Sequence, residues 1–369
     1  MHGCPACGPA YTGLVSELLS LADAERFLRA RYGSRAGAVT PLGAGDWSRV
    51  FAVTLDGREM AVKFGAYRED FAKDALMAVH SSRSLPIPAV HDSGPIAAGL
   101  DGGALASGAL ADGCFAVSQR ARGNFLDQLD EAGMRAVLPA LLAALCTARS
   151  IKVPGPDDQS PGGHSPADSG ADEHGPGGRS PESDGPGGYG RWRSDGTAPH
   201  RSWRDALLDI VHDRPGGRTH GWRRALAGSP TGAGPFDDAA GALRGLAPSG
   251  PQPRQLIHSD LLYRNVFVQG AAVTAVLDWG NSMYGDGLYD LAWLLYWWSW
   301  FPAWREIDID VIIRDHLAAA GEWRGDTGAR LRCYQIHIGL DSQAYNAFTG
   351  RWQELASNAQ QTAALAERA

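Results

Sequence analysis

Short runs of alternating apolar and polar residues dominate the first third of the chain and predict a small sheet with two helices. Leu18, Leu21 and Leu28 share one helical face, which predicts the first helix. Pro86 and Pro88 cannot lie inside a helix and end the second one. The strands are expected within residues 39–53 (two strands around a glycine turn), 59–64 and 114–119, and the helices within 14–32 and 67–82.

The rest of the chain carries mainly helical periodicity. Its most apolar run ends at Pro302 and is about eleven residues long, which is too short to span a bilayer and predicts a buried helix. Further helices are predicted within residues 134–150, 203–227, 239–246, 305–320 and 331–350. The order of elements therefore predicts an α+β fold with an N-lobe (residues 1–119) and a mainly helical C-lobe (residues 120–369).

Residues 154–200 interrupt this pattern. They are rich in glycine and proline, contain the imperfect repeats SPGGHSP, GPGGRSP and GPGGYG, and have almost no aliphatic side chains. Such a stretch cannot bury enough apolar surface to offset the entropy lost on ordering. We therefore expect a disordered insertion in the C-lobe, with His164, His174 and His200 exposed to solvent rather than bound to metal.

Composition and charge narrow the possible partners. The net charge of −7 and the absence of a Lys/Arg run argue against nucleic acid as a ligand, and an acidic surface is compatible with a cationic small molecule. Five cysteines do not suggest a disulfide framework, and Cys4 and Cys7 lack the second ligand pair that a zinc site needs. No signal peptide is visible. We expect a cytoplasmic protein that acts as a monomer, with no membrane partner.

The chemistry points to residues 256–280, LIHSDLLYRNVFVQGAAVTAVLDWG. His258, Asp260 and Asn265 follow the pattern H-x-D-x-x-x-x-N, and Asp278 begins a D-W-G triplet after a predicted hairpin. This is the layout of a kinase catalytic loop and its metal-binding turn. Asp260 would accept the proton of the attacking hydroxyl, and Asn265 and Asp278 would hold Mg²⁺.

The N-lobe contains matching candidates for nucleotide binding. Lys63 lies in an apolar strand like the V-A-I-K strand of kinases, and Asp74 on the following helix would hold it. Taken alone, Lys63 is equally consistent with a lysine extending from a sheet edge, and the glycine turn with an ordinary hairpin. The remaining candidates are Gly43, Gly45 and Ser48 around the phosphates, and the backbone of Gln119 and Ala121 at the adenine.

The segments IHSDLLYRNVFV, VLDWGNSMYGD and YDLAWLL together resemble the aminoglycoside phosphotransferase family, which has the protein-kinase-like fold. The resemblance covers most of residues 44–348 apart from 154–200, and it extends furthest toward members that act on hygromycin B. It implies ATP-dependent phosphorylation of an aminoglycoside or aminocyclitol hydroxyl with Mg²⁺, although GTP stays open as the nucleotide. The substrate site that it implies contains Asp260, Asn281, Trp297, Trp300 and Asp341.

Two departures from protein kinases favour a small-molecule substrate. Ser259 replaces the catalytic-loop arginine that pairs with a phosphorylated activation loop, and no A-P-E follows Asp278. Two alternatives remain: a kinase for a metabolic alcohol such as choline, a sugar or homoserine, and a nucleotide-binding regulator without catalysis.

Overall fold

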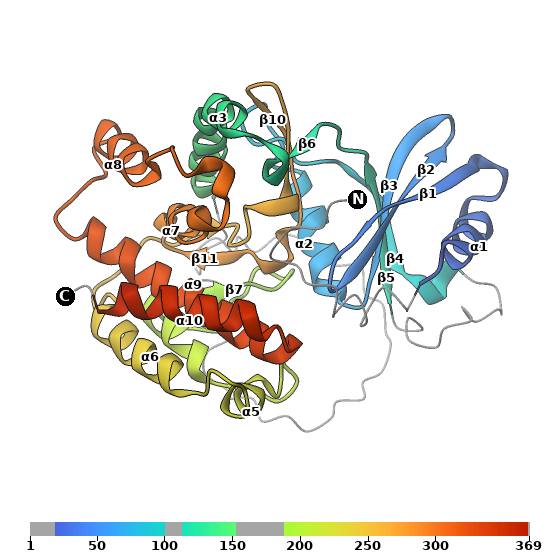
Figure 1. Ribbon diagram of the computed structural model, residues 1–369. Helices are drawn as coiled ribbons and strands as arrows, with labels where there is room; N and C mark the ends of the chain where they lie inside the picture. Colours follow the sequence, from blue (N-terminus) through green and yellow to red (C-terminus); the bar gives the residue numbers. More distant parts are fainter. Residues whose placement is uncertain (1–18, 100–112, 153–187, 368–369) are drawn as a thin grey trace, which may run out of the picture.

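The computed structural model describes residues 19–99, 113–152 and 188–367, which form two lobes (Figure 1). The smaller lobe is an antiparallel sheet in the order β1-β2-β3-β5-β4. Helix α1 packs on this sheet through a buried cluster that includes Phe27, Phe64 and Phe115. The elements are α1 Leu21–Tyr32, β1 Ala36–Ala44, β2 Ser48–Leu55, β3 Arg58–Gly65, α2 Arg68–Ala78, β4 Val90–Pro95 and β5 Cys114–Gln119.

The N-lobe strands agree with the prediction, with the exception of β4. This strand contains histidine, aspartate, glycine and proline, so it carries little apolar signal and is defined by its pairing with β5. Helix α1 begins at Leu21 because Ser20 and Asp23 form a reciprocal capping box. Helix α2 ends at Ala78 rather than at residue 82, since the side chains of Ser81 and Ser82 accept backbone hydrogen bonds in the following turn.

The larger lobe is mainly helical and carries two small sheets, β10-β9-β6 and β7-β11-β8. The hairpin between the catalytic loop and the D-W-G triplet forms as predicted, and Gly270 at its turn has φ +58°. The elements are β6 Asn124–Phe125, α3 Glu131–Ser150, β7 Gly190–Arg191, α4 Trp203–Leu208, α5 Trp222–Ala227, α6 Gly234–Leu246, β8 Gln255–Ile257, β9 Val266–Gln269, β10 Ala272–Val276, β11 Met283–Gly285, α7 Leu288–Trp297, α8 Ile309–Ala319, α9 Thr327–Thr349 and α10 Trp352–Ala366.

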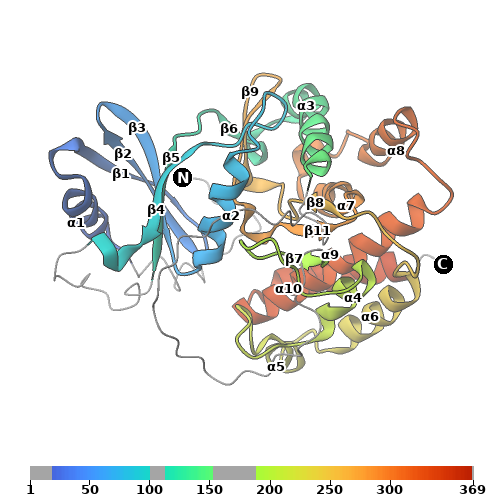
Figure 2. The same ribbon diagram turned by 180° about the vertical axis from the view of Figure 1, so that it is seen from behind.

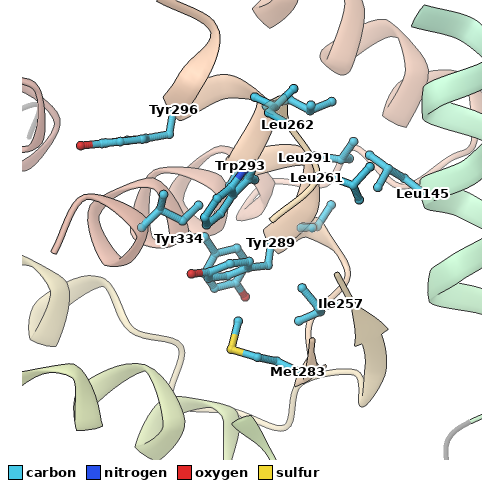
Figure 3. Close-up of a cluster of buried hydrophobic side chains, with 14 of the residues drawn as sticks. Leu145, Ile257, Leu261, Leu262, Met283, Tyr289, Leu291, Trp293, Tyr296 and Tyr334 are labelled. Atoms are coloured by element: carbon cyan, nitrogen blue, oxygen red, sulfur yellow. The ribbon is translucent and has the colours of Figure 1, made fainter. Parts of the chain in front are cut away.

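Helix α7 lies at the centre of this lobe and is buried as predicted. Figure 3 shows its Tyr289, Leu291 and Trp293 among side chains of the catalytic loop, α3 and α9. Helix α3 is the one helix of the described chain with the length and hydropathy to cross a membrane. Because its apolar face, including Met134 and Leu141, is fully buried in the same cluster, we interpret α3 as a core helix.

Helix α10 was not predicted, because its sequence has only two leucines to mark a buried face. Leu355 and Leu365 are buried in the core of the lobe, and a polar contact adds to them: the Tyr296 hydroxyl donates to Oδ1 of Asn358 at 2.8 Å. Thr362 packs against Gly339 of α9, where a Cβ would lie 2.1 Å from the threonine Oγ1. A glycine is therefore required for the close approach of α9 and α10.

The predicted insertion extends too far toward the C-terminus. Its first part, including His164 and His174, lies outside the described residues, but residues 188–200 are packed on the C-lobe. Arg191 pairs with Met283 of β11, and the indole of Trp192 is 6% exposed and stacks on Tyr284 with ring centroids 5.3 Å apart. His200, predicted to be solvated, has a side chain 18% exposed and close to Asp209. Composition missed this packing because one tryptophan and several closely approaching glycines carry it.

A buried carboxylate connects α9 to the turn that precedes α7. Asp286 is 1% exposed and accepts hydrogen bonds from Nε of Arg330 at 2.9 Å, from the Tyr334 hydroxyl at 2.5 Å and from the backbone N of Leu288 at 3.1 Å. Arg330 also lies 3.8 Å from Asp326, whose side chain is 65% exposed. The same arginine thus has one buried and one exposed acidic partner.

We expect Asp286→Ala to lower the free energy of unfolding by about 3 kcal/mol, because it removes the buried partner of the partly buried Arg330 guanidinium and of the Tyr334 hydroxyl. Asp326→Ala removes only the exposed partner and should cost less than about 1 kcal/mol. Urea unfolding of both variants measures the difference. Equal losses in the two variants would contradict the structural role of Asp286.

Candidate active site

A buried carboxylate on α7 holds the backbone of the catalytic loop. Asp290 is 3% exposed, and its oxygens accept the backbone N–H groups of His258 at 2.9 Å and Ser259 at 2.8 Å. Burial raises the pKa of Asp290 to about 6, against the effect of these two hydrogen bonds. Ser259 has φ +59°, a conformation that a non-glycine residue keeps only when its surroundings impose it. The loop is therefore held in one shape before any ligand binds.

His258 connects this loop to the strand that leads to Asp278. Its Nε2 lies 2.8 Å from the carbonyl O of Leu277, and its ring packs edge-on against Trp279. The imidazole is fully buried, and burial lowers the pKa of His258 to about 4. A neutral histidine therefore donates to Leu277 and links the loop that contains Asp260 to the strand that leads to Asp278.

Asp260 stands at the floor of the cleft. Its backbone O accepts Nδ2 of Asn265 at 2.7 Å, and its carboxylate lies 3.5 Å from Nδ2 of Asn281. Burial and the neighbouring charge of Asp278 raise the pKa of Asp260 to about 8, although both amides oppose the shift. In the ligand-free site Asp260 therefore keeps its proton at neutral pH, and positive charge from bound ligands would favour the ionised form that can accept a proton.

Lys63 joins two acidic residues from opposite lobes. Its Nζ lies 3.3 Å from Oδ2 of Asp74 on α2 and 3.2 Å from Oδ1 of Asp278 in the C-lobe. Burial alone would lower the pKa of Lys63, but the charges of Asp278 and Asp74 outweigh it, and the pKa lies above its usual value. The other oxygen of Asp74 accepts the backbone N–H of Trp279 at 2.8 Å. Asp74, chosen from the sequence, thus contacts both the lysine and the D-W-G turn.

The donor set around Asp278 suits a magnesium ion bound together with phosphates. The Asp278 side chain is 40% exposed, and its pKa is lowered because Lys63 offsets the effect of burial. Since Asn265 donates through Nδ2, its amide oxygen is the atom left to act as a ligand. The described residues contain no cluster of three His, Cys, Asp or Glu side chains that could hold a metal alone. Mg²⁺ typically takes one or two protein oxygens plus substrate phosphates, and Asp278 and Asn265 fit that requirement.

A cavity of about 810 Å³ lies above Asp260 and is lined by all five residues predicted for the substrate. Asn281 lines it beside the catalytic loop, Trp297 and Trp300 line it from the end of α7 and the turn that follows, and Asp341 lines it from α9. The Trp300 indole is oriented by a 2.7 Å hydrogen bond to Gln361. Residues from distant parts of the chain therefore share one space with Lys63, Asp260 and Asp278.

Other predicted residues do not line this cavity. Gly43 lies near the end of β1, paired with Val50 of β2, and Gly45 lies in the exposed turn that follows, whereas Ser48 reaches the cavity wall. The backbone N–H of Gln119 donates to Ala89 at 2.9 Å and is engaged within the N-lobe. Ala121 lies just after β5, which ends at Gln119, and does not line the cavity.

No sequence pattern predicted a contact between the glycine turn and the C-lobe. Asp46 accepts two hydrogen bonds from Nη2 of Arg351, at 2.8 and 3.0 Å, and one from the Tyr345 hydroxyl. Trp47 stacks on Phe348 with ring centroids 6.3 Å apart. These side chains close the cavity on the side of α9 and α10. The pattern G-A-G-D-W-S places Asp46 in a turn, but only the fold shows its partner.

Three further cavity residues were also missed. Nδ1 of His337 lies 2.9 Å from the hydroxyl oxygen of Tyr289, and burial lowers the pKa of His337 to about 4. Arg191, from the segment predicted to be disordered, lies 3.7 Å from Asp341. Lys73 is buried beside the D-W-G turn. A signal existed for Lys73 alone, since the chain contains only three lysines.

Comparison with known proteins gives a consistent picture. A family model described as "Phosphotransferase enzyme family" matches residues 38–331. The hygromycin-B 4-O-kinase of Escherichia coli is 26% identical over 339 residues, which cover 92% of this chain and 83% of that protein.

Solved structures agree on the fold. The crystal structure of aminoglycoside phosphotransferase APH(4)-Ia has a TM-score of 0.70 at 24% identity, over 94% of this chain and 98% of that one. A thermostable mutant of APH(4)-Ia, in ternary complex with AMP-PNP and hygromycin B, has a TM-score of 0.68 at 23% identity, over 93% of this chain and 97% of that one. The predicted kinase-like two-lobed fold is confirmed.

We expect Asp260→Asn to stabilise the ligand-free protein in a pH-dependent way. The pKa of Asp260 rises from 3.8 to about 8 on folding, so its ionisation opposes folding. This loss of folding free energy is absent below the pKa of Asp260 in the unfolded chain. It grows as the pH rises and is complete above the pKa of Asp260 in the folded protein. The variant should gain about 1–3 kcal/mol over wild type at pH 8.5 and almost nothing at pH 4. Urea unfolding at both pH values measures this, and a gain independent of pH would contradict the raised pKa.

Proposed function

The chain belongs to the phosphotransferase enzyme family, and from this premise we propose that it transfers the γ-phosphoryl group of ATP to a hydroxyl of an aminoglycoside, with hygromycin B as the substrate. One observation carries the proposal: Lys63, Asp260 and Asp278 share a single cavity with Trp297, Trp300 and Asp341. Phosphate-binding, proton-accepting and ring-binding groups thus lie around one space large enough for a multi-ring ligand. The similarity to the hygromycin-B 4-O-kinase supports the choice of substrate.

In this mechanism the substrate hydroxyl lies against Asp260, which accepts its proton as the oxygen attacks the γ-phosphorus. The bond between the γ-phosphorus and its bridging oxygen breaks, and ADP leaves. Lys63 holds the nucleotide phosphates, and Asp74 orients Lys63. Asp278 and Asn265 would hold Mg²⁺, which would supply positive charge beside the phosphate oxygens when bound. Most of the rate enhancement comes from alignment and fixed charge rather than from covalent chemistry.

Substrate recognition would combine flat aromatic surfaces with negative charge. Trp297 and Trp300 pack edge to face with centroids 5.3 Å apart and offer faces for sugar rings. Asp341 would attract an ammonium group of the antibiotic.

The nucleotide would bind on the N-lobe side of the cleft. The adenine would lie near the backbone of Gln119 and Ala121, and the phosphates would lie beneath residues 43–48, which include Gly43, Gly45 and Ser48. We place the enzyme in the cytoplasm, where ATP is available and the thiols of Cys114, Cys146 and Cys333 stay reduced. We propose that it acts as a monomer.

The direct experiment is ADP release by the purified protein with Mg²⁺ and ATP or GTP, against hygromycin B, other aminoglycosides, choline and homoserine. Turnover with hygromycin B, and phosphate recovered on the antibiotic, is the expected result. Turnover with choline or homoserine alone would keep the phosphotransferase and reject the antibiotic as substrate. Nucleotide binding without turnover of any compound would favour the non-catalytic alternative.

We expect Asp260→Asn to lower kcat by on the order of 10²-fold or more while the Kd for ATP changes little, because a positioned base contributes that much to the transition state. Steady-state kinetics and nucleotide titration measure the two quantities. Asp310→Asn, in an exposed position of α8, is the matched control and should behave as wild type. Comparable turnover in Asp260→Asn and wild type would remove Asp260 from the mechanism.

Trp300→Ala should raise KM for the antibiotic by roughly 10-fold, since a stacking aromatic face contributes about 1 kcal/mol or more to binding. The KM for ATP should stay within about twofold of wild type on the same reasoning. Trp323, 38% exposed and away from the cavity lining, provides the control variant Trp323→Ala. A KM for the antibiotic equal in both variants would exclude Trp300 from the substrate site.

A further inference from the structure

The chain uses lysine sparingly, and one of its lysines has no part in the mechanism above. Of 34 Lys and Arg residues only Lys63, Lys73 and Lys152 are lysines. Lys63 contacts the acidic residues of the cleft, and Lys152 is exposed. Lys73, on α2, is only 2% exposed. Burying a charged amine costs several kcal/mol unless its surroundings replace water, so the contacts of Lys73 require an explanation.

The contacts of Lys73 are with the backbone of the D-W-G turn. Its Nζ donates to the carbonyl O of Gly280 at 2.9 Å and to that of Ser282 at 3.0 Å. The remaining side of the ammonium faces the ring of Trp192, whose centroid lies 4.8 Å away. Two carbonyls and one aromatic face thus take the place of water around this group.

Other groups of the same turn are also held by hydrogen bonds. The carbonyl O of Asn281 accepts the Ser259 hydroxyl at 2.7 Å, and the backbone N of Trp279 donates to Asp74. The indole N–H of Trp192 donates to the Ser282 hydroxyl at 2.8 Å. Gly280 packs so closely on α2 that a Cβ would lie 2.6 Å from the Asp70 carboxyl carbon. Lys73 therefore supplies two of the bonds that fix the turn between Asp278 and Ser282.

The turn needs such support because its backbone is strained. Asp278 has φ +61°, and a residue of this type stays in the left-handed region only when its neighbours determine it. A lysine fits here where an arginine does not: the ammonium is a compact charge that donates in three directions, whereas a guanidinium is a flat fork. In a chain with so few lysines, this geometry points to a specific requirement for the amine.

We propose that Lys73 is a positioning residue that holds the turn from Asp278 to Ser282, so that Asp278 and Asn281 face the cavity in the orientation required for nucleotide binding. Trp192 covers the lysine and keeps water away from it. The segment that precedes α4 is thus part of the active-site structure, although it contacts no reacting atom. The proposal depends on the proposed function only for the role of Asp278 toward the metal and nucleotide, and not for the shape of the turn.

Lys73→Met, which keeps the length of the side chain and removes the amine, tests the proposal against Lys152→Met as the matched control. In ligand-free protein we expect faster deuterium uptake in peptides that cover residues 278–285 of Lys73→Met, with the N-lobe sheet unchanged. The Mg²⁺ concentration for half-maximal ATP binding should rise about 10- to 100-fold, as for other residues that orient metal ligands. Ethylammonium added to Lys73→Ala should restore part of this binding and should have no effect on Lys152→Met.

Deuterium uptake and Mg²⁺ requirement equal to those of Lys152→Met would overturn the proposal. If Lys73→Met does not fold, Trp192→Leu replaces it. This variant keeps the lysine and removes the aromatic ring that covers it. We expect faster deuterium uptake in the turn and a higher Mg²⁺ requirement, both smaller than in Lys73→Met. A turn unchanged in Trp192→Leu would then overturn the proposal. Wild type that binds Mg²⁺-ATP but phosphorylates no antibiotic would contradict the proposed function alone, since the exchange of the turn is measured without ligand.

Discussion

The catalytic site depends on the carboxylate of Asp290, which accepts the backbone N–H groups of His258 and Ser259 from inside the C-lobe. Without this partner, two buried N–H groups would lose their hydrogen bonds. The positive φ of Ser259 would then no longer be stabilised by its surroundings. Asp290 lies on α7, whose Tyr289, Leu291 and Trp293 are part of the hydrophobic core (Figure 3). The position of the catalytic loop is therefore tied to the packing of this core.

Charge is distributed unevenly around this fixed loop. Asp74, Asp260 and Asp278 converge on a space in which Lys63 is the cation that contacts two of them. The ligand-free site therefore has unfavourable electrostatics, which is visible in the raised pKa of Asp260. A divalent cation and a positively charged substrate would both relieve this imbalance. The site is arranged for the charges of its ligands at a cost in the stability of the empty protein.

Several contacts between the two lobes are made by residues of the site. Lys63 from β3 pairs with Asp278, and the Lys73 amine on α2 reaches the carbonyls of Gly280 and Ser282. At the other end of the cavity, Asp46 between β1 and β2 pairs with Arg351 between α9 and α10. Figure 2 shows α2 between the sheet and the C-lobe, where it can make these contacts. Any change in the angle between the lobes therefore alters the site itself.

Elements with strong local signals could be predicted from the residues alone. Alternation and helical periodicity predicted most strands and helices, and the spacing of His258, Asp260, Asn265 and Asp278 predicted a kinase-like site, because chemistry and the hairpin fix that spacing locally. Features that depend on partners far away in the chain became visible only in the folded protein: the pairing of β4, the hydrogen bonds of α10, the ordered segment around Trp192, and the ion pair of Asp46 with Arg351. These features rest on single side chains whose burial or charge is compensated by a distant residue, and no local pattern records such a match.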